Sequence, residues 1–190
     1  MEVQFDPGFV KYMSAFVPNI ELMYNSLASY KNFNQKKIQF KMYYPKVQNL
    51  IKNYMGFFTG CILWAEVIKQ HDNAEILNNY CYGGEYSQDE TLSETKFIRD
   101  YLEQLKKDAK YYIGQNFEVD EDYIKILDCY EEFLKANEGF VKTKTTNDIK
   151  FPNCIKTLSK EDLKIISEEI DKIVENGKIQ ELLLLKDKVI

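Results

Sequence analysis

The most apolar stretch of the chain is Tyr54-Met55-Gly56-Phe57-Phe58-Thr59-Gly60-Cys61-Ile62-Leu63-Trp64-Ala65-Glu66-Val67-Ile68. It contains the single tryptophan, and no charged residue precedes Glu66 within it. A helix at a protein surface keeps a polar stripe, and this stretch has almost none, so we expect a helix that is buried nearly all round. The stretch is too short to span a membrane, which takes about 20 apolar residues. The other helices are expected to pack around it.

Length and composition are those of a globular chain, with 190 residues of which 45 % are hydrophobic and 29 % charged. This is long enough for a substantial core in one domain or two small subdomains. The formal net charge is -5, and Arg99 is the only arginine. Because nucleic-acid binding relies on clustered Lys and Arg, the acidic balance argues against a nucleic-acid partner.

Four widely spaced cysteines, Cys61, Cys81, Cys129 and Cys154, form no CxxC pair. A zinc site needs closely spaced ligand pairs, so we expect no metal and no other cofactor. Cys61 and Cys129 fall in apolar helical runs, and we expect both to be buried, reduced thiols in a cytoplasmic protein. The N-terminus lacks the basic segment and apolar run of a signal peptide.

Apolar residues recur every three to four positions, and no segment shows the alternation of a strand, so the predicted fold class is all-α. We expect two small helical bundles packed around a buried central helix over 45–70, which Pro45 would begin. A main helical domain would cover 1–141, a linker 142–154, and a helical pair packed on the main domain 155–190.

Local signals mark several helix ends. Thr91 opens a Thr-x-x-Glu capping box and predicts a helix start. Asp120-Glu121-Asp122 places negative charge where the next helix dipole is positive, and Gly139 is expected to cap the far end of that helix. Ser159 predicts the start of a further helix, which would extend to Gly177.

Catalytic motifs are sparse. His71 is the only histidine, which excludes the histidine-rich metal site of an HD-type phosphohydrolase and leaves a nucleophile without its usual base. Gly83-Gly84 is followed by Glu85, and an acidic residue there would repel phosphate, so a P-loop is excluded. We therefore expect no enzyme and no small-molecule substrate. A helical enzyme would need a deep polar pocket at Glu66 with a second, convergent acid.

Several tyrosines fall at expected helix ends and loops. A place in the core or scattered over the surface is the favoured interpretation, and a protein interface, in which tyrosine is enriched, is the alternative. These residues are Tyr80, Tyr82, Tyr86, Tyr111 and Tyr112.

Three ordered patterns occur between about residues 50 and 141. They are Cys61-Ile62-Leu63-Trp64-Ala65-Glu66-Val67; Tyr82-Gly83-Gly84-Glu85 ahead of a helix with Phe97 to Leu105; and Leu127-Asp128-Cys129-Tyr130, followed by Asn137-Glu138-Gly139-Phe140. Together they resemble the cytoplasmic domain of the TssL/DotU (IcmH-like) family, the inner-membrane components of type VI secretion.

Three departures from the family pattern stand beside the resemblance. The family has Asp before the helix Glu, where this chain has Ala65, and the spacing from Glu66 to Gly83 is shorter than usual. The family's C-terminal membrane helix is also absent from this chain.

The resemblance implies a hook of two helical bundles that docks other protein subunits of a secretion complex and has no catalysis. Glu66 and the loop Tyr82-Gly83-Gly84-Glu85-Tyr86 would be its scaffold or docking elements. Membrane contact is expected only through a helix not present in this chain, at the cytoplasmic face of the inner membrane. A homodimer is a further option. The alternative function is a small acidic, all-helical inhibitor or regulator that binds a single protein target.

Glu66 stands near the C-terminal end of the apolar stretch. A carboxylate on an otherwise apolar helix must find a hydrogen-bond donor or reach water. We expect it to pair with a backbone N–H, a tyrosine or a lysine of a neighbouring helix, and so to fix how the helices meet.

Overall fold

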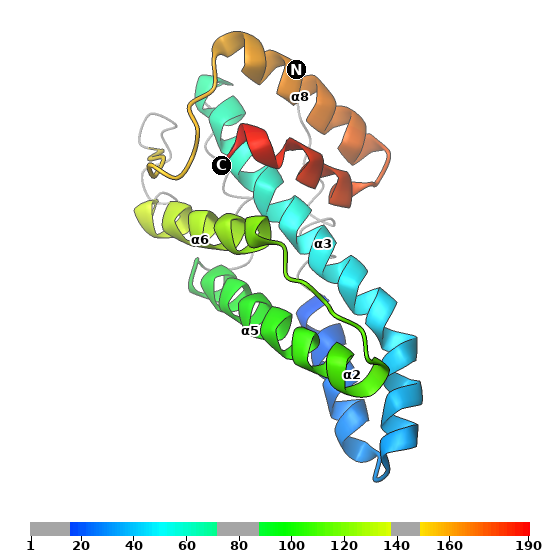
Figure 1. The fold of residues 1–190 in the computed structure, drawn as a ribbon. Helices are drawn as coiled ribbons and strands as arrows, with labels where there is room; N and C mark the ends of the chain where they lie inside the picture. Colours follow the sequence, from blue (N-terminus) through cyan, green and yellow to red (C-terminus); the bar gives the residue numbers. More distant parts are fainter. Residues whose placement is uncertain (1–15, 72–87, 138–148) are drawn as a thin grey trace.

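The structure, a computed structural model, describes residues 16–71, 88–137 and 149–190 (Figure 1). Over these residues the chain forms helices and no strand, which confirms the all-α fold class. None of the described helices is long and apolar enough to cross a bilayer. The elements are α2 (Phe16–Ser29), α3 (Phe33–His71), α5 (Gln88–Ile113), α6 (Glu121–Ala136), α8 (Lys160–Glu175) and the 3₁₀ helix η2 (Ile179–Lys188).

The long helix α3 is the axis of the fold, because every other described element packs against it. Its N-terminal half lies beside α2 and α5, and its C-terminal half lies beside α6, α8 and η2 (Figure 1). Every residue from Tyr54 to Leu63 is buried. The prediction of a helix buried nearly all round is confirmed for this stretch.

The N-terminal end of α3 differs from the prediction of a helix over 45–70. The helix begins at Phe33, and Pro45 lies inside it. A proline removes one backbone N–H and crowds the carbonyl four residues earlier, here that of Lys41. Pro45 and Lys41 are both exposed, so water can bind that carbonyl, while Phe40 on the opposite side is fully buried. Burial of the opposite side of α3 therefore keeps the chain helical at Pro45, despite the lost hydrogen bond.

Aromatic packing joins α3 to α6. Phe58 stacks on Tyr130 with the ring centroids 4.5 Å apart, and Tyr54 lies 5.6 Å from Phe58. All three side chains are fully buried. Such ring pairs contribute about 0.5–1.5 kcal/mol beyond the area that they bury. The stacking of Phe58 on Tyr130 therefore contributes substantially to the packing of α3 against α6.

The ends of α5 and α6 test three of the predicted boundaries. α5 begins three residues before Thr91, so the capping box predicted there is wrong; the preceding Gln and Glu are good helix formers and let the helix extend. The negative charge predicted at the start of α6 is confirmed by Glu121 and Asp122 in its first turn. The Asp120 side chain also caps this helix, since it accepts a hydrogen bond from the Asp122 N–H at 3.0 Å. Asn137 caps the other end in place of Gly139, which lies outside the described residues.

The C-terminal helices begin and end at local signals. The predicted cap of α8 is confirmed, because the Ser159 hydroxyl accepts a hydrogen bond from the Asp162 N–H at 3.1 Å. After α8, Gly177 has φ of +66°, a left-handed conformation that favours glycine, and Lys178 N–H donates to the Ile173 carbonyl at 3.2 Å. The chain then turns back, and its last element is a 3₁₀ helix that packs along α3.

A disulfide joins Cys129 of α6 to Cys154, 25 residues further along the chain. The prediction that Cys129 is a reduced thiol is therefore wrong, whereas Cys61 is buried and remains a thiol as predicted. The pair forms because the segment before α8 returns to the core, where Ile149 and Ile155 are buried. The cytoplasmic setting that was inferred from reduced thiols loses this support and stays a prediction.

The predicted linker 142–154 is described from residue 149 onward. Its backbone is fixed to the end of α6, because the Asn137 amide donates to the Lys150 carbonyl at 2.9 Å and accepts from the Lys150 N–H at 2.8 Å. The division of the chain into domains stays a prediction.

Candidate functional site

Glu66 lies in the C-terminal half of α3 with a side chain that is 9 % exposed. Its carboxylate accepts a hydrogen bond from the backbone N–H of Leu158, just before α8, and Lys69 one turn along α3 stabilises its charge. The expected pairing with a backbone N–H is confirmed, but the donor Leu158 lies just before α8 and not within a neighbouring helix. The contact fixes the start of α8 against α3.

The protonation of Glu66 is shifted by its surroundings. Burial raises the pKa of the carboxyl from 4.5 to about 7, although the Leu158 N–H and the charge of Lys69 both act to lower it. One carboxylate oxygen, Oε1, is buried and has no hydrogen-bond partner among the residues that the structure describes. Loss of hydration on one oxygen without a replacement donor disfavours the charged form, which is the physical cause of the raised pKa.

A cavity of about 320 Å³ opens beside this carboxylate. Its other described lining residues are Lys69, Phe151, Ile155, Lys156, Thr157 and Leu163. Both lysines of the lining donate to backbone carbonyls, Lys69 to that of Ile149 at 3.1 Å and Lys156 to that of Asp187 at 2.8 Å. The ammonium of Lys69 also lies 5.2 Å from the centre of the Phe151 ring.

The chemistry that this cavity can support follows from its polar groups. Acid–base catalysis uses two convergent titratable groups, and the described lining offers Glu66 as its one carboxylate. The lysines bind the carbonyls of the chain segments that frame the cavity. As described, the arrangement holds the segment 149–158 on α3.

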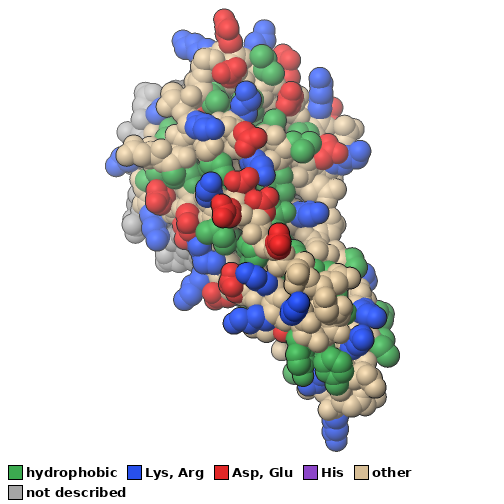
Figure 2. All heavy atoms as spheres, in the orientation of Figure 1, with side chains coloured by type: hydrophobic (Ala, Val, Ile, Leu, Met, Phe, Trp, Pro, Cys, Tyr) green, Lys and Arg blue, Asp and Glu red, His purple; other side chains and the backbone are tan. Residues whose placement is uncertain are grey.

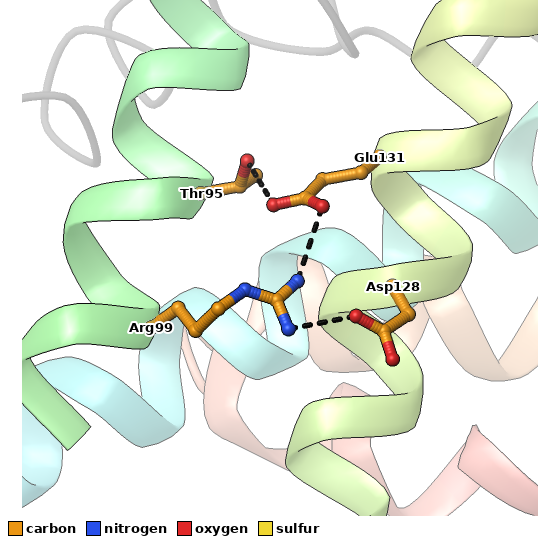
Figure 3. Close-up of polar contacts among 4 residues, drawn as sticks. All are labelled: Thr95, Arg99, Asp128 and Glu131. Atoms are coloured by element: carbon orange, nitrogen blue, oxygen red, sulfur yellow. Dashed lines mark hydrogen bonds and ion pairs between the residues drawn. The ribbon is translucent and has the colours of Figure 1, made fainter. Parts of the chain in front are cut away.

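A second polar cluster joins α5 to α6 (Figure 3). Arg99 lies between two carboxylates, 2.7 Å from Asp128 Oδ1 and 3.1 Å from Glu131 Oε2. The Thr95 hydroxyl donates to the other oxygen of Glu131 at 3.0 Å. Partial burial acts to lower the pKa of Arg99, but the two carboxylates outweigh it and raise that pKa. The planar guanidinium can bridge two acids at once, which a lysine cannot do in the same geometry.

This cluster is not among the sites predicted from the sequence. Asp128 and Glu131 lie on one side of α6 at a spacing of three, and Arg99 is the only arginine of a lysine-rich chain. These two features are the available signal, but the pairing itself depends on how α5 packs on α6.

The predicted docking loop Tyr82-Gly83-Gly84-Glu85-Tyr86 lies outside the described residues. Of the predicted site residues, Glu66 is therefore the one whose surroundings are described. The role of the loop in docking stays a prediction.

Exposed aromatic rings gather where the end of α5 meets the start of α3. Tyr111 is 67 % exposed and Phe33 is 43 % exposed. Their rings meet edge to face at 5.3 Å, and the half-buried Tyr112 stacks on Phe33 at 5.8 Å. We call Phe33, Tyr111 and Tyr112 the aromatic corner. Tyr111 is thus a surface residue, and the interface alternative for this tyrosine stays open.

Phe58, three residues before the first pattern of the TssL/DotU resemblance, stacks on Tyr130 of the third pattern. The Tyr-Gly-Gly-Glu pattern lies outside the described residues. Membership of that family stays a prediction. The chain matches no model of a known family, no curated protein and no solved structure.

Proposed function

We propose that this chain is a non-catalytic protein-binding module and that the aromatic corner is its docking surface. The observation that carries the proposal is the exposure of Tyr111, whose ring stands 67 % open on the described surface. Aromatic residues are enriched in protein interfaces and among the residues that dominate binding energy. An exposed ring pair at a helix end is a surface of that kind.

The rings of the corner are supported from beneath. Phe33 touches both Tyr111 and Tyr112, and Tyr112 in turn lies 5.3 Å from the fully buried Phe40. A side chain already held by packing loses little rotamer freedom when a partner covers it. The corner therefore offers a preorganised apolar contact.

The kind of partner follows from two separate arguments. The TssL/DotU resemblance supports another subunit of a bacterial secretion complex, with this chain as a scaffold. The net charge of -5 supports the alternative, an acidic inhibitor or regulator of one protein target. A second copy of this chain is the third candidate.

The test compares two single substitutions that each remove an exposed apolar side chain from different ends of the fold. Tyr111→Ser changes the aromatic corner, and Leu184→Ser changes η2, where Leu184 is 78 % exposed. Tagged full-length chain is purified from its native cells with its partners, which are quantified by mass spectrometry. We expect Tyr111→Ser to lower recovery of one specific protein by about tenfold or more, as for an interface hot spot, and Leu184→Ser to leave it unchanged.

The identity of the lost protein decides between the candidates. A secretion or envelope subunit supports the scaffold function, a single other target supports the regulator, and loss of self-association supports the homodimer. Equal recovery by both variants and the wild-type protein, at unchanged melting temperature, would refute docking through the corner.

A further inference from the structure

The outer side of α3 between Ile38 and Lys52 is exposed along its length. Residues three and four apart lie on one side of a helix, and those on this side are all exposed in this segment, whereas Phe40, Tyr44 and Val47 on the other side are buried. We call the exposed side the lysine face. It comprises Ile38, Lys41, Met42, Pro45, Lys46, Asn49 and Lys52.

Two large aliphatic side chains stand on this face one helical turn apart. Ile38 and Met42 are each 62 % exposed. Single exposed apolar residues are common on protein surfaces and need no explanation. Here two of them lie in line with lysines on a side of the helix that no described element covers.

The charged residues between Glu21 and Glu66 are all lysines. No acidic residue occurs between Glu21 and Glu66, whereas six of the 25 basic residues fall there. All 30 acidic residues lie elsewhere in the chain, so this segment is basic within a protein of net charge -5, although Glu21 and Asp108 lie on the neighbouring helices α2 and α5. Figure 2 shows lysine and hydrophobic side chains together over the tapered end of the molecule, with acidic side chains concentrated away from it.

From this placement we propose that the lysine face binds the surface of a bilayer that contains anionic phospholipids. The ammonium groups would contact the headgroups, and Ile38 and Met42 would enter the boundary between headgroups and acyl chains. At 1.5 Å per residue the face is about 21 Å long, so its three exposed lysines can contact lipid together. The contact is peripheral and lies in the plane of the membrane surface.

A lipid surface fits this face better than a protein or a nucleic acid does. Lysine is depleted at the centre of protein interfaces, where aromatic residues and arginine are enriched. Nucleic-acid phosphates would match the lysines but would leave Ile38 and Met42 against a polar backbone. A bilayer accommodates the charges and the aliphatic pair at once. The face is also distinct from the aromatic corner, since Phe33 packs toward α5.

The test measures co-sedimentation of the full chain with vesicles of phosphatidylcholine, alone or mixed with phosphatidylglycerol. We expect binding to the mixed vesicles alone, and its loss at high salt, because salt screens exposed charges. The triple variant Lys41→Gln/Lys46→Gln/Lys52→Gln should bind about a hundredfold more weakly, since each lysine near an anionic surface contributes about fivefold.

A matched triple variant separates the effect of where the lysines lie from the effect of losing three positive charges. Lys160→Gln/Lys164→Gln/Lys172→Gln removes three exposed lysines from α8 at the other end of the fold, and we expect it to bind vesicles nearly as the wild-type protein does. Equal weakening by the two triple variants would overturn the proposal, because it would show a non-specific effect of net charge.

Substitution of Ile38 and Met42 distinguishes binding to lipid from binding to other polyanions. Ile38→Ser/Met42→Ser should weaken binding to mixed vesicles by about tenfold, because it removes the apolar part of the contact. Mixed-vesicle affinity equal to that of the wild-type protein would refute lipid docking, and retention on duplex DNA as strong as on vesicles would indicate a general polyanion surface. Binding of Tyr111→Ser to vesicles should be unchanged, so this proposal and the protein-docking proposal can fail separately.

Discussion

Replacing Glu66 by glutamine should make the protein more stable at neutral and alkaline pH. Burial raises the folded-state pKa of this carboxyl from 4.5 to about 7. The folded state therefore binds a proton more tightly than the unfolded state, and the stability that this proton provides is fully present below pH 4.5. It is lost as the pH rises through 7. At about 1.4 kcal/mol per unit, the charged form lowers the free energy of unfolding by about 3 kcal/mol at pH 8.

Glutamine is a suitable replacement because it is neutral at every pH and nearly equal in volume. Its amide oxygen can still accept the hydrogen bond from the Leu158 N–H. Guanidinium denaturation of both proteins across the pH range from below 4.5 to above 7 gives the free energy of unfolding, and subtracting the two curves cancels the other titrating groups. The difference should be near zero at the acidic end and about 3 kcal/mol in favour of Glu66→Gln at the alkaline end.

Glu132→Gln is the control for the loss of one negative charge, because it replaces an exposed acid on α6. A flat difference curve for Glu66→Gln would show that the carboxyl is hydrated in the folded state. A curve of opposite sign, with glutamine less stable above pH 7, would show that Lys69 and the Leu158 N–H stabilise the carboxylate more than burial destabilises it. Either result would refute the reasoning about Glu66.

Three further substitutions test the contacts between elements by chemical denaturation. Cys129→Ser should lower the free energy of unfolding by about 3 kcal/mol, since the disulfide closes a loop across a separation of 25 residues, and reductant should then have no further effect. Asn137→Ala should cost about 1–3 kcal/mol and speed amide exchange at Lys150; unchanged exchange would contradict the pairing. Arg99→Lys should cost about 1–2 kcal/mol, because an ammonium cannot bridge both acids; a value near zero would show that the cluster is merely a surface contact.

The helices themselves could be predicted because their signals are local. The apolar period, the charge around Asp120 and the hydroxyl of Ser159 each act within one helical turn, and the acidic start of α6 and the Ser159 cap are both present as expected. The errors at Pro45 and Thr91 arose where local rules were applied alone. Burial of the opposite side of α3 keeps the chain helical at Pro45. Good helix formers before Thr91 extend α5 toward its N-terminus, beyond the capping signal.

The candidate site could be predicted in part. Glu66 was identified because a carboxylate in an apolar stretch is a local anomaly, but its donor, Leu158, lies 92 positions later and becomes a neighbour only in the fold. The disulfide and the Arg99 cluster are non-local in the same way. The lysine face was missed for a different reason: the net charge of -5 averages over the chain and conceals a segment without any acidic residue.

The two ends of the fold use their polar groups differently, and this difference bears on where binding takes place. Near the C-terminal end of α3, Lys69 and Asn137 bond to backbone carbonyls of the segment before α8. A polar group that is already satisfied within the protein gains little from a partner, because it must first break that bond. At the other end, the lysines of the outer face of α3 and the ring of Tyr111 remain open to solvent. Groups that exchange only water for a partner are the ones from which binding energy can come, and both proposed contacts use such groups.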